Sequence, residues 1–484
     1  MNKLAEPESL FDAVDVLEEI ETKPRRWKAY GNTKSTGVPW VGDIPSHWRC
    51  HRIKWTVTAC KNGIWGEEPD GLNDVVCVRV ADFDRVGMRV SVDDPTKRAV
   101  TAKERQGRLL RSGDLLLEKS GGGELQPVGA VTVYDHDTDA VCSNFVARMP
   151  VAVGEDTWFL AYLHHHLYAG RVNTRSIKQS IGIQNLDARQ YLEEVAALPP
   201  LPEQRAIAAF LRRETAKIDG LVEKKRRLID LLKEKRSALI SHAVTKGLNP
   251  KAPMKPSGDR WLEKIPAHWT LRPLGTAIRY ISYGFTNPMP TSDETDDPFM
   301  LTANDIQDGR IAYEGARRTT QSAFLTEVTD KSRPKPGDIL VTKDGTLGRI
   351  AVADETPICI NQSVALLRVN NVASVDFVQW CLRSAPYQER ILFDAGGTTI
   401  KHIYITRIVK MPLACPQLSE QSEICAAVRA ISERYELLTD RVLLAIESLL
   451  EYRSALISAA VTGKIDVRDN SSEAIHSGDY ERQH

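Results

Sequence analysis

Two glycine-rich stretches contain the residues best suited to chemistry. Lys119 precedes Ser-Gly-Gly-Gly at residues 120–123, and Lys343 precedes Asp-Gly-Thr-Leu-Gly at residues 344–348. Small residues let backbone N–H groups face an anion, so each stretch could hold a phosphate. A tight β-turn is the alternative. The two stretches follow similar apolar runs, which indicates that they occupy equivalent places.

Patterns typical of enzymes are weak in this chain. Asp114, Glu118 and Lys119 resemble the residues of a metal-dependent nuclease. Their spacing is wrong, however, and Thr342 stands where a second Glu118 would be expected. No Walker A or dinucleotide-binding glycine motif occurs. The (D/N)-P-P-(Y/F) motif of amino-methyltransferases is missing too. Residues 287–290, Asn-Pro-Met-Pro, are only weakly similar to it. We therefore expect no catalytic residue.

The histidines and cysteines do not form a pattern of metal ligands. His164, His165 and His166 are consecutive, and consecutive side chains on a helix point about 100° apart, so they cannot converge on one ion. Eight cysteines are scattered without a C-x2-C pair or a histidine at zinc-finger spacing. We expect reduced thiols and no metal site.

Basic and amide side chains gather in two other segments, residues 171–180 and 396–402. Arg, Lys, Asn and Gln are the side chains that reach phosphates and base edges, although a solvated loop is the alternative for any one of them. Together with the glycine-rich stretches, these segments and the residues beside them supply the candidate DNA-binding residues. The candidates are Lys119, Ser120, Arg175, Lys178, Gln179, Gln184, Asn185, Lys343, Asp344, Thr346, Lys401 and His402.

Composition limits the class of protein. The 484 residues include 64 Lys plus Arg and 64 Asp plus Glu, so the formal net charge is zero. This excludes a histone-like polycation but not a local basic face. No apolar run approaches the roughly 20 residues of a bilayer span. The N-terminus is acidic and lacks the apolar core of a signal peptide. We expect a cytoplasmic protein without a membrane partner.

The elements that position these residues are duplicated along the chain. Residues 201–246 and 418–463 align without a gap at an offset of 217, with 19 identities in 46 positions. Upstream, W-x3-I-P-x-H-W recurs at residues 40–48 and 261–269, and Gly-Asp recurs at residues 113 and 337. Each half is therefore a variable globular region followed by a matched helical arm. The paired tryptophans could stack on bases, but their shared Ile-Pro context favours anchors of the fold.

Both arms have apolar residues at spacings of three, four and seven, which predicts one helical stripe about 66 Å long. Such a stripe needs a partner. From residue 203 to 246 twelve basic side chains stand against six acidic ones, whereas from 420 to 463 four basic stand against seven acidic. Opposite net charges favour pairing of the two arms with each other. Two separately solvated arms are the alternative.

The globular regions contain short β-type runs bounded by Gly, Asp and Pro. Apolar segments at residues 157–172 and 375–392 predict two matched helices. Each region is therefore expected to be α+β.

Taken together, these motifs resemble the specificity subunit of type I restriction-modification systems. The resemblance rests on W-x3-I-P-x-H-W, PGDILVTKDGTLG, the L-x-E-Q helix start and the RSALIS-x-AVTGKIDVR end. It extends from about Val38 to Arg468 and includes the duplication itself. The first repeat departs from it, with KSGGG in place of KDGTLG.

The resemblance implies an α+β fold with two tandem-duplicated mixed α/β target-recognition domains. Two long helices, packed as an antiparallel coiled coil, would join them as a spacer. The implied domains are an N-terminal extension (1–24), recognition domain 1 (25–200), helical region 1 (201–250), recognition domain 2 (251–417), helical region 2 (418–468) and a tail (469–484).

The resemblance also implies partners. Each recognition domain would read one half of a split, asymmetric double-stranded DNA site. Two modification subunits would methylate adenine with S-adenosylmethionine, and restriction subunits would use ATP and Mg, so this chain itself would bind no cofactor. The competing hypotheses are a coiled-coil scaffold that does not read DNA and a self-contained DNA-modifying enzyme.

Overall fold

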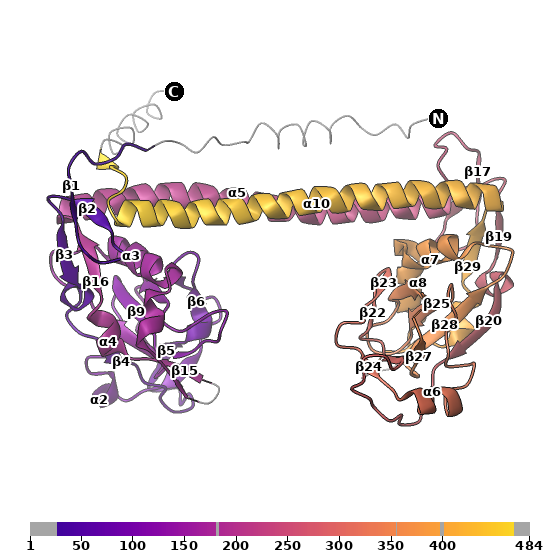
Figure 1. Ribbon diagram of the computed structural model, residues 1–484, viewed down its shortest axis with the longest axis horizontal. Coiled ribbons are helices and arrows are strands. Elements are labelled where there is room, and N and C mark those ends of the chain that lie inside the picture. The colour runs from indigo at the N-terminus through magenta and orange to yellow at the C-terminus, as the bar shows by residue number, and fades with distance from the viewer. Residues whose placement is uncertain (1–26, 181–182, 355, 397–400, 469–484) are drawn as a thin grey trace. The chain divides into compact units, whose positions relative to one another are not determined.

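The computed structural model of the chain describes residues 27–180, 183–354, 356–396 and 401–468. The predicted extension (1–24) and tail (469–484) lie outside these ranges. Contacts divide the described residues into two compact units. The first unit contains residues up to 225 and from 444 onwards, and the second unit contains residues 226–443. Each unit holds one globular domain and parts of both long helices (Figure 1).

The globular domain of the first unit is built on a six-stranded sheet in the order β4-β13-β9-β11-β7-β6. These strands are β4 (Lys61–Asn62), β13 (Val146–Met149), β9 (Asp114–Glu118), β11 (Val131–Tyr134), β7 (Arg89–Val90) and β6 (Phe83–Asp84). Two three-stranded sheets accompany it, β12 (Ala140–Cys142), β5 (Asp74–Val78) and β8 (Lys97–Ala99), and β10 (Ser120–Gly121), β15 (Ile183–Leu186) and β14 (Ile177–Ser180). Helix α3 (Thr157–Ala169) packs against β9 and β11. Three consecutive leucines of β9 are fully buried, because both faces of this central strand are covered.

The globular domain of the second unit has a four-stranded sheet in the order β20-β28-β25-β26 and a three-stranded sheet β24-β21-β27. Their bounds are β20 (Ile278–Tyr283), β28 (Val364–Val369), β25 (Ile339–Thr342), β26 (Ile350–Val352), β24 (Arg317–Arg318), β21 (Phe299–Leu301) and β27 (Ile358–Ile360). One apolar core joins this sheet to the helices. It includes Leu367 of β28, Phe377 of α7 (Val375–Arg383) and Ile240 and Val428 of the two long helices.

Each domain combines parallel and antiparallel strand pairs with helices, which confirms the predicted α+β class. One prediction was wrong in detail. The helix expected over residues 375–392 is divided at Ser384 into α7 and α8 (Ala385–Asp394). Ser384 is extended, with φ −74° and ψ 151°, and Pro386 occupies the first turn of α8, where a proline fits because that N–H needs no helical partner. Within the described ranges, no helix has the length and hydropathy of a membrane span.

The two arms are unbroken helices, α5 (Leu201–Lys246) and α10 (Leu418–Val461), and they pack together as predicted (Figure 1). Asp219 pairs with Arg453 in the first unit and Arg236 pairs with Glu436 in the second, so the helices run antiparallel. The two ion pairs are equivalent under the duplication. Asp219 corresponds to Glu436 and Arg236 corresponds to Arg453, both at the offset of 217. An antiparallel pair of equivalent helices makes every contact twice in this way.

The buried stripe follows a longer period than the sequence spacing indicated. Ile207, Ile218, Ile229 and Ile240 are all buried and recur every 11 residues along α5. Their counterparts on α10 are also buried. An 11-residue period corresponds to 3.67 residues per turn rather than the 3.5 of a heptad coiled coil. Leu221 and Leu228 fit the spacings of three, four and seven but are only half-buried, and the neighbouring Val222 and Ile229 are buried instead.

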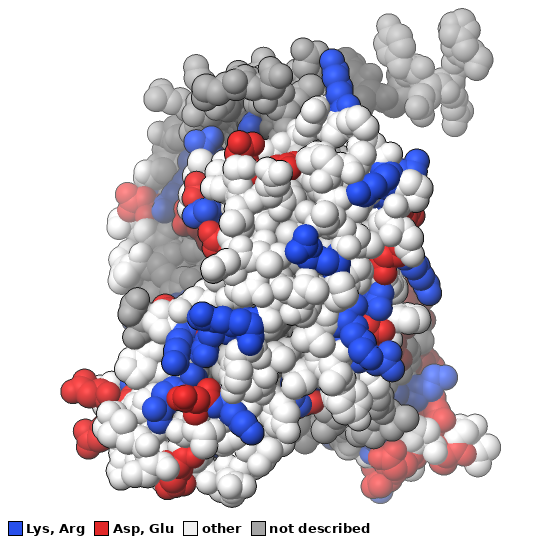
Figure 2. Space-filling view, turned by 90° about the vertical axis from the view of Figure 1, so that its right-hand side faces the viewer, with Lys and Arg blue, Asp and Glu red and all other residues white. Residues whose placement is uncertain are grey.

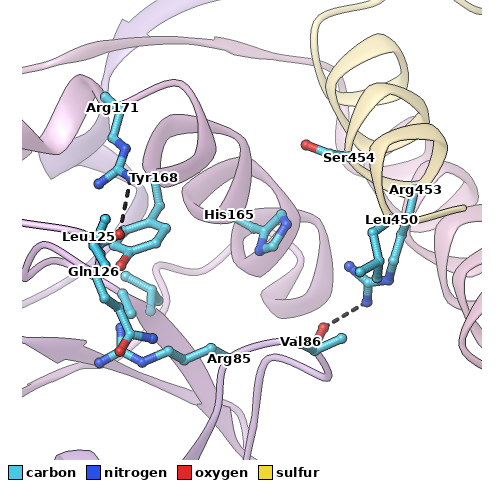
Figure 3. A pocket seen from close by; sticks show the side chains of 12 residues that line it. Arg85, Val86, Leu125, Gln126, His165, Tyr168, Arg171, Leu450, Arg453 and Ser454 are labelled. Atoms are coloured by element: carbon cyan, nitrogen blue, oxygen red, sulfur yellow. Dashed lines mark hydrogen bonds between the residues drawn. The ribbon is translucent and has the colours of Figure 1, made fainter. Parts of the chain in front are cut away.

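Arg453 also joins the helices to the first globular domain. Its guanidinium donates to both Asp219 carboxylate oxygens, at 2.8 and 3.3 Å. It also donates to the Val86 carbonyl at 2.7 Å (Figure 3). The side chain is only 5% exposed. A cavity of about 410 Å³ lies beside it, with His165 of α3 and Leu450 of α10 in its lining.

We expect Arg453→Ala to lower the free energy of unfolding of the first unit by about 2 kcal/mol, because the Val86 carbonyl and a carboxylate that is 37% exposed lose the buried guanidinium. This corresponds to a loss of roughly 4–8 °C in Tm. The matched control is Arg236→Ala at the equivalent position. Its pair with Glu436 is 28% and 60% exposed, so the expected cost is below about 1 kcal/mol. Equal losses in calorimetry would contradict this assignment.

Candidate nucleic-acid interface

Lys119 stands where one strand changes its partner. Its N–H donates to the Phe145 carbonyl at 2.8 Å, next to β13, and its carbonyl accepts from the Leu186 N–H of β15 at 2.8 Å. The strand thus leaves the six-stranded sheet at Lys119 and continues as β10 in a small separate sheet. Its side chain donates from Nζ to Asn62 Oδ1 at 2.7 Å.

Lys343 makes the same exchange in the second unit. Its N–H donates to the Ser363 carbonyl at 2.8 Å, and its carbonyl accepts from the Ile403 N–H at 2.9 Å. The partners correspond to those of Lys119 at offsets of 218 and 217. We call Lys119 and Lys343 the switch lysines. The sequence predicted that the two glycine-rich stretches occupy equivalent places. The backbone hydrogen bonds of Lys119 and Lys343, which precede them, are equivalent as well.

Beyond the first switch lysine, three predicted residues form one row across the small sheet. Ser120 is opposite Asn185, which is opposite Lys178, so the three side chains share a face. Ser120 Oγ lies 2.8 Å from Asn185 Oδ1. Lys178 Nζ donates to Asp187 Oδ2 at 2.7 Å, and this ammonium, with backbone N–H groups, holds the pKa of Asp187 below its usual range. The row offers hydroxyl, amide and ammonium groups side by side.

The corresponding row in the second unit has different chemistry. Asp344 is opposite His402, and Lys343 Nζ donates to Asp344 Oδ2 at 2.7 Å. The His402 ring meets the Tyr404 ring edge-on at 4.1 Å between centroids. Lys343 Nζ also lies 5.4 Å from the ring centroid of Tyr283. The structure thus brings together three predicted residues and two exposed tyrosines.

The remaining predicted residues occupy other places. Arg175 stacks on Trp40 at 4.4 Å, outside the row of Lys178. Thr346 lies at the tip of its turn, and Lys401 is exposed beside His402. In the next row of the small sheet, Gln184 accepts from a backbone N–H through its side chain and pairs through its backbone with Gln179.

The first glycine-rich stretch begins as strand β10, and the second forms a loop after Lys343. The N–H of Gly348 donates to the Thr342 carbonyl at 2.9 Å, and the N–H of Gly123 donates to the Gln126 carbonyl at 2.9 Å. These two N–H groups are therefore bonded to nearby carbonyls and do not face an anion. Neither bond closes a β-turn, so the first stretch is a short strand with a loop and the second is a longer loop.

The acidic residues that resembled a nuclease site form internal ion pairs. Asp114 accepts from Arg148 at 2.6 Å. Glu118 is fully buried and accepts two bonds from Arg85, at 2.8 and 2.9 Å. Asp338 repeats the first pair in the second unit. These buried carboxylates are neutralised by partly buried arginines, so they are not available to a metal ion or a nucleophilic water.

The consecutive histidines are placed within the fold. Burial lowers the pKa of His164 to about 4, and its Nδ1 lies 2.7 Å from the Tyr191 hydroxyl. His166 contacts the Trp40 carbonyl through Nε2 at 3.3 Å. Across the part of the chain that the structure describes, no group of three or more His, Cys, Asp or Glu side chains could hold a metal ion.

The matched tryptophans anchor the domains, as their Ile-Pro context indicated. Trp48 and Trp269 are fully buried. The indole N–H of Trp40 donates to a backbone carbonyl at 3.0 Å, and the Trp261 ring packs 5.5 Å from that of Phe393. None of these four side chains is thus presented to solvent as an open stacking surface.

Surface charge is divided into local groups. Figure 2 shows Lys and Arg side chains of the second unit in several separate groups, with Asp and Glu between them. Such local groups agree with a chain of zero net charge. Phosphate contacts from this chain would therefore be local.

Sequence reasoning missed two residues that touch the switch lysines, Asn62 and Tyr283. Each ends a short strand and precedes a glycine, at the same offset of 221 as the tryptophan motif. A Cβ at Gly63 would lie 1.8 Å from the Cys142 carbonyl oxygen, and a Cβ at Gly284 would lie equally close to that of Ile360. This repeated pair of glycines was the available signal.

We expect Gly63→Ala to destabilise the first globular domain and Gly284→Ala the second, each by roughly 1–3 kcal/mol, because the added methyl meets a backbone carbonyl. Amide hydrogen exchange should show faster opening only in the domain that carries the substitution. Gly31→Ala is the control, because a Cβ there meets nothing within 4 Å. Unchanged exchange in both variants would show that the backbone accommodates the methyl.

Comparison with known proteins gives a consistent answer. A family model described as the type I restriction modification DNA specificity domain matches residues 293–448. The type I restriction enzyme EcoBI specificity subunit of Escherichia coli is 24% identical over 327 residues, 65% of this chain and 68% of that protein. The proposed specificity subunit of type I restriction enzyme MjaX, from Methanocaldococcus jannaschii, is 22% identical over 438 residues, 88% of this chain and 96% of that protein.

A solved structure supports the same fold. The chain aligns with a TM-score of 0.62 and 19% identity to a chain from work on complex assembly and conformational transition of the type I R-M system. The alignment covers 87% of this chain and 99% of the other. In its matched family domain and in the sequences of these two relatives, this chain is similar to the specificity subunits of type I restriction-modification systems.

Proposed function

We propose that this chain is the DNA sequence-recognition subunit of a type I restriction-modification complex, and that each globular domain reads one half of a split, asymmetric site. The observation that carries the proposal is the repeated strand exchange at Lys119 and Lys343, which presents different side chains on the same backbone. Base edges are read by the donors, acceptors and apolar groups of such side chains. Two domains of one fold can thus recognise two different half-sites. The scaffold hypothesis gives no reason for this difference and is not favoured.

The chain acts in the complex without catalytic residues of its own. The acidic side chains that resembled a nuclease site are bonded to Arg85 and Arg148. In this proposal, two modification subunits carry S-adenosylmethionine and methylate adenine, and restriction subunits use ATP and Mg for DNA cleavage. The paired helices set the distance between the half-sites. A subunit that acts on chromosomal DNA would work in the cytoplasm.

The long helices offer a surface for the modification subunits. In the second unit, Leu231 of α5 and Leu437 and Leu443 of α10 are 50%, 55% and 45% exposed. The Arg236–Glu436 pair sets the register of the helices, so Leu231 lies level with residue 441, between the two leucines of α10. Large apolar side chains exposed along this length of both helices favour a partner that covers them.

We expect Leu437→Asp combined with Leu443→Asp to abolish co-purification of the modification subunit, because the charges would have to be buried in the interface. The Tm of the isolated chain should fall only slightly, since both side chains are about half exposed. Leu325→Asp on α6 (Gln321–Thr326), which is 61% exposed in the same unit, is the matched control. Undiminished co-purification of the double variant would rule out this surface.

The proposed function predicts chain-dependent adenine methylation. Cells with the modification subunit should show a split methylated motif in single-molecule sequencing only when this chain is also present. Asn185→Ala should relax one half of that motif and His402→Ala the other, because each side chain belongs to one domain. If the complex assembles but no motif depends on this chain, the scaffold hypothesis is favoured instead.

A further inference from the structure

The duplication provides an internal comparison between two equivalent positions. Asn62 ends β4 opposite Ala147, and Tyr283 ends β20 opposite Ala365. The two positions are 221 residues apart, and their partners are 218 apart. The same place in the fold therefore carries an amide in one domain and a phenol in the other.

The backbone at both positions is held in place. The glycines that follow, Gly63 and Gly284, leave no room for a Cβ. The next N–H groups donate to the same carbonyls that those glycines approach, Ile64 to Cys142 at 2.7 Å and Phe285 to Ile360 at 3.0 Å. A side chain at either position is thus presented from a fixed point, and a substitution changes its chemistry more than its placement.

Both side chains lie against the switch lysine of their own domain. Asn62 Oδ1 accepts from Lys119, which leaves the amide NH₂ group free to donate elsewhere. Tyr283 is 47% exposed, with the Lys343 ammonium over its ring. Both positions are therefore exposed next to the rows of Ser120 and Asp344, which are the candidate DNA contacts.

We propose that Asn62 and Tyr283 are specificity-determining residues, each for the half-site of its own domain. The Asn62 amide donates to an acceptor on a base edge, and the Tyr283 ring packs against a thymine methyl group. These are the contacts by which an amide and an apolar surface distinguish base pairs in the major groove. The inference rests on the proposed function and assigns to it two residues that were not among the sequence candidates.

The test uses the full chain in cells that also make its modification subunit, with adenine methylation read by single-molecule sequencing. Asn62→Ala should relax one base pair of one half-site, and Tyr283→Ala one base pair of the other, by roughly 5- to 150-fold in discrimination. Val153→Ser and Leu325→Ser are controls, because both side chains are exposed in the same two domains and lie outside the rows.

One conservative variant at each position distinguishes a side chain that reads a base from one that only supports the fold. Asn62→Asp keeps an oxygen for Lys119 but replaces the free donor by an acceptor, so we expect the preferred base to change at one position. Tyr283→Phe keeps the ring and should leave the motif unchanged. In duplexes with uracil in place of thymine, binding by the wild-type complex should fall to that of the Tyr283→Ala complex.

The outcomes distinguish this inference from the proposed function. A split motif that is identical for the wild type, Asn62→Asp and Tyr283→Ala would overturn the inference and leave the function intact. A wild-type complex that assembles without any chain-dependent motif would overturn the proposed function itself.

Discussion

The first turn of each long helix holds its globular domain in place, and the other features of the unit depend on that attachment. The Gln204 amide accepts from the Asp156 N–H at the start of α3, at 2.8 Å, and donates to the Pro199 carbonyl at 3.0 Å. Gln421 makes the same two bonds at the start of α7 and to the proline before α10. Both amides are buried, and a buried group without a partner costs about 1–3 kcal/mol. The glutamine of the L-x-E-Q motif thus attaches each long helix to its globular domain.

The attachment of helix to domain is the same in both units. The two domains differ in the side chains that follow the switch lysines on an equivalent backbone. The switch lysines bond through the same backbone groups in both units, yet the next residue is Ser120 in one and Asp344 in the other. The facing residue is Asn185 in one and His402 in the other. Recognition of two different half-sites therefore requires no second fold. It requires only different donors, acceptors and rings on equivalent strands.

The sequence predicted the architecture well because the duplication and the helical spacing are long-range patterns. Charge was a poorer guide to the actual pairs. In the pair between Asp219 and Arg453, the acid comes from the basic arm and the base from the acidic arm, since local geometry decides which side chains meet. The site was predicted only in part. Asn62 lies on a two-residue strand that carries no periodic signal, and Arg175 stacks on Trp40, a contact between distant segments that spacing does not reveal.

The structural units do not coincide with the repeats of the sequence. Helix α5 is divided between the two units after residue 225, and α10 is divided after residue 443. A substitution in either arm therefore alters an interface made with the other repeat, which restricts how far the arms can diverge. This accounts for 19 identities in 46 positions and an alignment without gaps in the arms. The globular regions are not restricted in this way, so the offset between matching positions of the two repeats varies from 217 to 224. Gene recombination could exchange one globular region for another and create a new specificity, provided that the arms remain compatible.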